Sequence, residues 1–193
     1  MLAAVKDGDE KKLAELISQD PGFNVNRSLD GDGVTLLHSA CKWSRSAVIP
    51  LLLAHPDIDV NVKDRFGCTP FDYACGGRAS SVREMLKDSR VKVNEPDKDG
   101  YTPLWSAARS QLDVIEWWIA SGREMNLGKP GDGKTDAIGG AKEKGKTEVV
   151  NLLERFKSDA AKTRSEVRKK LGINGQCCYP ILFPFILFSF LSF

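Results

Sequence analysis

The chain has 193 residues, of which 41% are hydrophobic and 28% are charged, proportions typical of a soluble globular domain and not of a disordered chain. Its 28 basic and 26 acidic residues leave a net charge of +2, so composition alone does not predict a surface for nucleic acid or membrane. The positive charge is concentrated towards one end, because residues 142–170 carry ten basic and five acidic side chains.

The cysteines indicate a reducing compartment. They are odd in number, contain no C-x-x-C pair and have no histidine at a metal-ligand spacing, which argues against a disulfide framework and a metal site. Charged residues begin at Lys6, so the amino terminus lacks an apolar core of signal-peptide length. We therefore expect the protein in the cytoplasm or the nucleus. The five cysteines are Cys41, Cys68, Cys75, Cys177 and Cys178.

A period of 33 to 34 residues runs through most of the chain. Glycines recur at this spacing, each followed two residues later by a threonine, and asparagines close the units. The glycines are Gly33, Gly67, Gly100 and Gly133; the threonines are Thr35, Thr69, Thr102 and Thr135; the asparagines are Asn26, Asn61, Asn94 and Asn126. Such a period predicts stacked copies of one small unit, none of which could bury its apolar face alone.

Each unit predicts a turn followed by two short helices. Glycine supplies a residue with positive φ in the turn, and threonine, with or without a following proline, opens the first helix as its N-cap. The second helix has one apolar face, as in Val114, Ile115, Trp118 and Ile119, and we expect Trp117 to be buried with them.

The first and last units are degenerate. Residues 2–26 keep an apolar stripe of Leu13, Leu16 and Ile17. In the last unit, Gly139 and Gly140 fall within the expected first helix, where each glycine costs on the order of 1 kcal/mol against alanine. We therefore expect that helix to be frayed.

The segments 35–40, 69–74 and 102–108, read as TLLHSA, TPFDYA and TPLWSAA, resemble the ankyrin repeat, whose period is about 33 residues. The resemblance covers residues 2–157. It implies an all-α ankyrin-repeat solenoid of about four to five helix-turn-helix repeats joined by β-turn loops. Leu36 stands in place of the usual proline, and Asp72 and Trp105 stand in place of the usual histidine.

Beyond the predicted array of residues 1–157, a capping helix is expected within residues 158–172. Ser158 or Asp159 can serve as its N-cap and Gly172 as its stop, and we expect it to cover the exposed end of the last repeat. Residues 173–193 form a hydrophobic tail that we expect to be unstructured or absent from the mature protein. Pro184 interrupts it, and too few apolar residues follow Pro180 to span a bilayer, so a membrane anchor is disfavoured and kept as the alternative.

Two motifs suggest chemistry and do not carry it. His38 has no acid or nucleophile at a useful spacing, and in the resembling family this histidine braces the turn by hydrogen bonds. Residues 128–135 satisfy G-x-x-x-x-G-K-[ST] formally, but a P-loop requires a buried strand before it and a well-formed helix after it. A P-loop enzyme is therefore only a third class, and we predict no catalytic, cofactor-binding or metal-binding residue.

The resemblance implies a non-enzymatic protein–protein interaction module or adaptor that binds another protein, and not nucleic acid, through its concave face. We expect it to be a monomer. Eight residues that the packing of the repeats does not require fall at turn tips and at the ends of first helices, and Trp, Tyr and Arg among them are types that carry binding energy. These predicted partner-binding residues are Lys42, Trp43, Arg65, Phe66, Lys98, Asp99, Tyr101 and Arg109.

Overall fold

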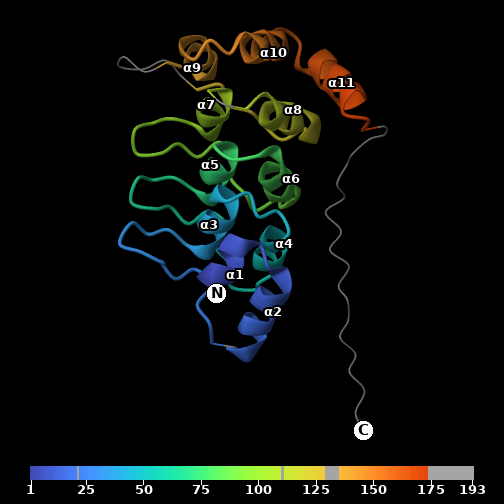
Figure 1. The fold of residues 1–193 in the computed structure, drawn as a ribbon. Coiled ribbons are helices and arrows are strands. Elements are labelled where there is room, and N and C mark those ends of the chain that lie inside the picture. The colour runs from blue at the N-terminus through green and yellow to red at the C-terminus, as the bar shows by residue number, and fades with distance from the viewer. Residues whose placement is uncertain (21, 110, 129–134, 174–193) are drawn as a thin grey trace.

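A computed structural model describes residues 1–20, 22–109, 111–128 and 135–173. Every regular element within these ranges is a helix, as the predicted all-α class requires (Figure 1). The expectation for the hydrophobic tail falls on residues 174–193 and lies outside the described residues, as do residues 129–134 of the P-loop-like stretch. No helix within the described part of the chain is long and apolar enough to cross a membrane.

The helices occur in consecutive pairs, followed by one additional helix. The pairs are α1 (Leu2–Asp7) with α2 (Glu10–Gln19), α3 (Leu36–Lys42) with α4 (Val48–Leu53), α5 (Pro70–Cys75) with α6 (Ala79–Lys87), α7 (Pro103–Ala108) with α8 (Leu112–Ser121), and α9 (Ala137–Glu143) with α10 (Thr147–Ser158); α11 is Ala160–Lys170. Within the described residues, these five pairs correspond to five repeats, of which the first and the last are the units predicted to be degenerate.

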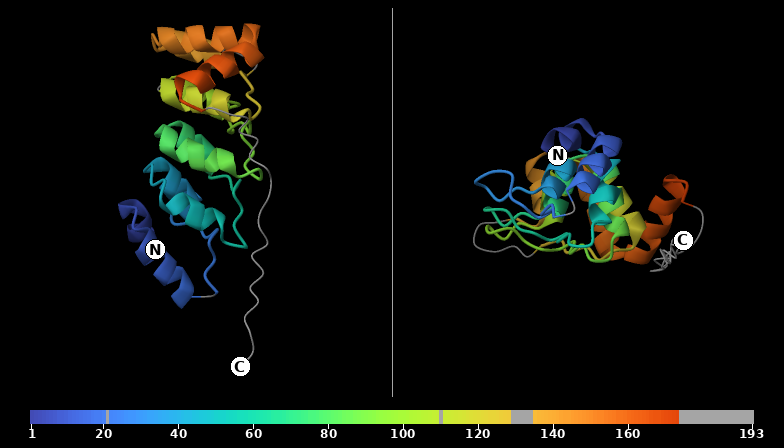
Figure 2. Two further views of the ribbon diagram at one scale, coloured as in Figure 1. Left: turned by 90° about the vertical axis from the view of Figure 1, so that its right-hand side faces the viewer. Right: turned by 90° about the horizontal axis from the view of Figure 1, so that it is seen from below.

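The pairs stack in chain order into a solenoid. First helices pack against first helices, from α1 through α3, α5 and α7 to α9, and second helices pack in a parallel row from α2 to α10. The two views of Figure 2 show this stack from the side and from below, with the connecting loops projecting to one side. The apolar core runs continuously along the seam between the two rows.

The local signals of the sequence act as predicted. Thr35, Thr69 and Thr102 cap α3, α5 and α7, each accepting a hydrogen bond from the backbone N–H three residues on. The repeat glycines that the structure describes, Gly33, Gly67 and Gly100, have φ of 83° to 84° and support the turn that precedes each helix.

Aspartates brace the loops from within, and asparagines tie neighbouring loops together. Oδ1 of Asp64 accepts the N–H groups of Phe66 and Cys68, and Asp97 does the same one repeat later. The side chain of Asn61 bonds across the repeat boundary, donating to the carbonyl of Arg90 and accepting from the N–H of Lys92. The loops are thereby held as a row and not as independent fingers.

The expectation of a frayed first helix in the last repeat is wrong, because α9 is formed through both glycines. Asp136 caps it by accepting from the N–H of Gly139 at 2.7 Å. A Cβ at Gly140 would lie 2.8 Å from Nε1 of Trp105, so this glycine makes room for the indole of the preceding repeat. The large ring and the missing side chain form one packing unit.

Arginines close the carboxyl ends of the second helices, where carbonyl oxygens lack partners within the helix. The acceptors recur every 33 residues, and each donor comes from the segment that follows the next helix pair. The pairs are Arg90 with Leu53 O (2.7 Å), Arg123 with Leu86 O (3.4 Å) and Arg164 with Ile119 O (3.2 Å). The first two donors are themselves 33 residues apart, whereas the third belongs to α11.

This third contact explains where α11 lies. We expected α11 to cover the exposed end of the last repeat; instead it packs against α10 and turns back against α8 (Figure 1). Arg168 also donates to the carbonyl of Ala120, and Lys170 pairs with the nearly buried Glu116. The division of the chain at residue 157 stays a prediction, since Asp159 ends α10 and caps α11 at once.

Candidate protein-binding surface

Two loop tips carry predicted binding residues and contact each other. Phe66 is 50% exposed, and the guanidinium of Arg65 lies 4.6 Å from the centre of its ring. Arg65 also pairs with Asp32 of the preceding loop at 2.7 Å. The N–H of Lys98 donates to the carbonyl of Phe66 at 2.9 Å, which places the exposed Lys98 on the next loop. These tips present an exposed aromatic ring with a guanidinium beside it, and an exposed lysine on the next loop.

A first row of contacts joins α3 and α5 to a loop; we call it the α5 row, made of Lys42, Tyr73 and Asp64. The Tyr73 hydroxyl donates to Oδ2 of Asp64 at 2.8 Å, and Nζ of Lys42 lies 6.0 Å from the centre of the Tyr73 ring. The ring of His38 is nearly perpendicular to the Tyr73 ring, with the two centroids 5.2 Å apart. Tyr73 is thus fixed in place while it remains partly exposed.

A second row, the α7 row, consists of Arg109, Trp105 and Tyr101. The rings of Tyr101 and Trp105 stack with centroids 4.0 Å apart, and the Arg109 guanidinium lies 4.2 Å from the Trp105 centroid. Two of the predicted residues, one from a loop and one from a helix end, therefore meet through an aromatic residue that was not predicted to bind. Stacked rings and a guanidinium supply a rigid surface at little cost in side-chain entropy.

The two remaining predicted residues stand apart from these rows. Trp43 is the C-cap of α3, 50% exposed and adjacent in sequence to Lys42. Asp99 is exposed on its loop, and its N–H donates to Oδ1 of Asp97 at 2.9 Å. Tyr73 and Trp105 were missed as binding candidates. A signal was present for Trp105, because an indole in place of the usual histidine cannot form the turn-bracing hydrogen bonds.

His38 has the structural role that the resemblance implied. Its Nδ1 accepts from Thr35, with Oγ1 at 2.9 Å, and Nε2 donates to the carbonyl of Cys68 on the next loop at 3.2 Å. Burial lowers the pKa of His38, which keeps the ring neutral and able to play both parts.

Asp72 forms the same capping box in the next repeat with a carboxylate. The backbone N–H and hydroxyl of Thr69 donate to Oδ2 of Asp72 at 2.7 and 2.8 Å. Burial nonetheless raises the pKa of Asp72 to about 6, against an ordinary value of 3.8. The buried charge is a cost that His38 does not incur in the preceding repeat.

This cost predicts that Asp72 makes the protein less stable as pH rises, the opposite of what a carboxylate with a lowered pKa does. Between pH 4 and pH 6 the folded protein holds more protons at Asp72 than the unfolded chain does, so the free energy of unfolding falls as pH rises through this window. The contribution is on the order of 2–3 kcal/mol for a shift of this size. Asp72→Asn keeps an acceptor for Thr69 and should remove this fall, measured as the difference between variant and parent in urea unfolding at pH 4.5 and pH 7.

Asp88→Asn is the matched control. Burial would raise the pKa of Asp88, but the hydrogen bonds and charge of Arg90 hold it below its ordinary value. The stabilisation that ionised Asp88 contributes is therefore already complete at pH 4.5. The free energy of unfolding of Asp88→Asn should lie below that of the parent by the same amount at both pH values. An Asp72→Asn variant that tracks the parent at both pH values would contradict the assigned cost.

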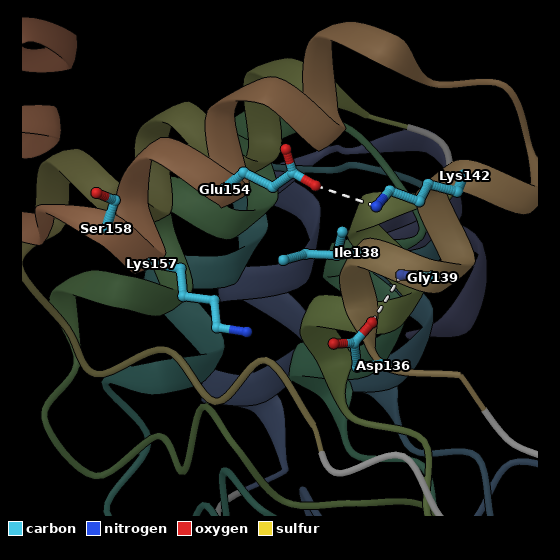
Figure 3. Close-up of a pocket in the computed structure, with 7 residues that line it drawn as sticks. All are labelled: Asp136, Ile138, Gly139, Lys142, Glu154, Lys157 and Ser158. Atoms are coloured by element: carbon cyan, nitrogen blue, oxygen red, sulfur yellow. Dashed lines mark hydrogen bonds and ion pairs between the residues drawn. The ribbon is translucent and has the colours of Figure 1, made fainter.

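The end of the last repeat carries a hollow of about 430 Å³ between α9 and α10. Figure 3 looks onto this hollow, with earlier repeats behind it. Lys142 and Glu154 form an ion pair across it, with Nζ of Lys142 3.0 Å from Oε1 of Glu154. Lys157 and Ser158 also line it, above a floor that includes Ile138. Charged side chains thus occupy part of the surface that α9 and α10 present at this end of the described repeats.

The geometry is that of a repeat solenoid, and comparison with known proteins identifies its family. A family model described as ankyrin repeats (3 copies) matches residues 1–97, which is half of the chain. The chain belongs to the ankyrin repeat family. Ankyrin repeats form an interaction fold that binds other proteins and has no catalytic chemistry of its own, and the resemblance seen in the sequence is confirmed.

The relatives that this chain resembles are proteins of several different kinds. The chain is 33% identical to Rabankyrin-5 of Homo sapiens over 107 residues, covering 54% of this chain and 9% of that protein. It is 31% identical to Alpha-latrotoxin-Lg1a of Latrodectus geometricus over 119 residues, or 61% and 9% of the two chains. It is 29% identical to Tyrosine-protein kinase Shark of Drosophila melanogaster over 163 residues, or 83% and 17%. The chain thus spans less than a fifth of each of these relatives.

Proposed function

We propose that this protein is an adaptor that binds one partner protein on the surface formed by the loops and the ends of the first helices. The observation that carries the proposal is the pair of aromatic–cation rows. In each row a ring is fixed by the fold itself, and both the residue that carries the ring and the positive charge beside it stay at least partly exposed. Preformed aromatic and arginine contacts are the groups that contribute most of the energy at interfaces.

The protein acts without catalysis, as a monomer, in the cytoplasm or nucleus. The placement in a reducing compartment is supported by the cysteines of the array: Cys41 and Cys75 are unpaired and buried, and burial raises the pKa of both thiols, which makes them inert packing groups. The positions of His38 and Asp72 in capping boxes support the absence of catalysis, since both side chains are used to brace turns.

The test is capture of the partner by the full chain and by the double variant Trp43→Ala with Tyr101→Ala. If both residues are anchors, each loss should be about 2 kcal/mol, or roughly 30-fold in affinity, and capture should disappear. Partner identity is read by mass spectrometry of the captured protein, and folding by circular dichroism.

Trp117→Ala is the control for loss of a tryptophan. Trp117 is partly exposed on α8 with the Arg83 guanidinium 4.1 Å from its centroid, so it resembles the α7 row in chemistry but belongs to a second helix. Capture should survive this change. Undiminished capture by a helical double variant would place the binding face elsewhere.

A further inference from the structure

We propose that the partner presents an extended acidic segment, with one carboxylate at Lys42 and a second at Arg109 five or six residues away. This inference rests on the proposed function, because it names the chemistry that the same surface would recognise. Three features of the structure carry it. Two cations form no ion pair with a carboxylate among the described residues, a glycine lies between them, and an acidic residue occupies the equivalent position in the last repeat.

The two cations are not neutralised within the described part of the chain. Lys42 and Arg109 make no ion pair there, and each is placed beside an aromatic ring instead. Arg65 and Lys63 on the neighbouring loops are different, since they pair with Asp32 and Glu95. A carboxylate arriving at Lys42 or Arg109 would therefore not have to displace an internal partner.

Lys42 and Arg109 hold equivalent places in their repeats. Each stands seven residues after the N-cap of its first helix, as does Gly76 in the repeat between them. Gly76 is exposed, and a Cβ there would meet only carbonyl oxygens of its own turn, at 3.8 and 3.9 Å. Equivalent positions in three consecutive repeats are thus occupied by Lys42, Gly76 and Arg109. The missing side chain at Gly76 lets the backbone of a partner approach closely.

The spacing follows from helix packing. Neighbouring helices pack about 8–10 Å apart, so α3 and α7, with α5 between them, are separated by about 16–20 Å. An extended chain advances about 3.3 Å per residue, which puts two carboxylates five or six residues apart in register with the two cations.

The equivalent position in the last repeat is occupied by an acidic residue, which limits the length of the proposed site. Glu143, seven residues after the N-cap Asp136, ends α9 and accepts from the hydroxyl of Thr135 at 3.3 Å. A third carboxylate one repeat beyond Arg109 would meet this negative charge. The segment should therefore be acidic over two repeats and neutral or basic over the next, which gives it a direction.

The experiment is selection from a displayed library of random twelve-residue peptides on the immobilised full chain. Enriched peptides should carry Asp or Glu in pairs five or six residues apart, and replacing both acids by Asn or Gln in a synthetic copy should weaken binding about tenfold. The double reversal Lys42→Glu with Arg109→Glu should enrich Lys or Arg pairs at the same spacing. The same reversal at Lys162 and Lys169 on α11 changes net charge equally and should leave the acidic preference intact.

Enrichment without acidic pairs, an unchanged preference on the double reversal, or no enrichment at all would each overturn the acidic segment. None of these results would decide whether the surface binds a partner protein, because that is tested separately by partner capture. If partner capture is still lost with Trp43→Ala and Tyr101→Ala, the surface binds a partner of other chemistry.

Discussion

Replacing Trp118 with alanine should lower the free energy of unfolding by about 3–5 kcal/mol, the cost of removing a large side chain from a packed core. The indole is fully buried on α8, meets the ring of Phe71 from the preceding repeat edge-to-face at 5.0 Å, and donates from Nε1 to the carbonyl of Glu124 at 3.2 Å. The variant loses packing across a repeat boundary and leaves that carbonyl without its partner. A loss of this size is a large part of the stability of a small domain.

Urea unfolding followed by circular dichroism measures the loss, with Trp117→Ala as control. Trp117 was expected in the core but is partly exposed beneath Arg83, so its removal should cost on the order of 1 kcal/mol. The adjacent residues thus separate burial from residue type. Equal losses for the two variants would contradict the orientation of α8.

The repeat architecture was predictable because its signals are local. A glycine with positive φ, a threonine N-cap and an apolar stripe act within a few residues of one another, so their spacing in the sequence is their spacing in the fold. Thr69 and Gly67 show this directly, since both perform the task that the sequence assigned. The buried position of Trp118 follows from the same periodicity.

The last repeat and α11 were less predictable because their structure depends on contacts between repeats. Helix propensity argued against α9, but Gly140 is required by the indole of Trp105, which stands 35 residues earlier in the chain. The position of α11 depends on Arg164 and Arg168, which donate to carbonyl oxygens at the carboxyl end of α8, more than 40 residues earlier in the chain. Neither requirement can be derived from the composition of the segment itself.

The candidate surface was predictable as a set of positions and not as a set of contacts. Lys42 and Arg109 were identified from their place in the repeat, but the rings beside them, Tyr73 and Trp105, come from adjoining elements whose side-chain directions the period does not give. The acidic-segment proposal therefore depends on the structure. Sequence alone gives two isolated positive charges.

Gly67→Ala should be the most damaging change in a loop, since two separate costs fall on one methyl group. The residue has a φ of 83°, which costs a non-glycine residue about 1–2 kcal/mol, and its Cβ would lie 2.8 Å from the backbone nitrogen of Lys98. Relieving that overlap requires the two loops to separate, at a further cost of about 1–3 kcal/mol. The bond from Lys98 N–H to Phe66 O would be strained by the same movement.

Gly33→Ala isolates the first cost from the second. It has the same φ of 83°, but its Cβ would stand 3.4 Å from Cα of Asp64, an ordinary contact. We expect Gly33→Ala to lose only the 1–2 kcal/mol of backbone strain and Gly67→Ala about 1–3 kcal/mol more, both measured by urea unfolding. Because the strained loops carry Phe66 and Lys98, Gly67→Ala should also weaken partner capture while Gly33→Ala does not. Matching losses in both variants would mean that the loops are not held together as described.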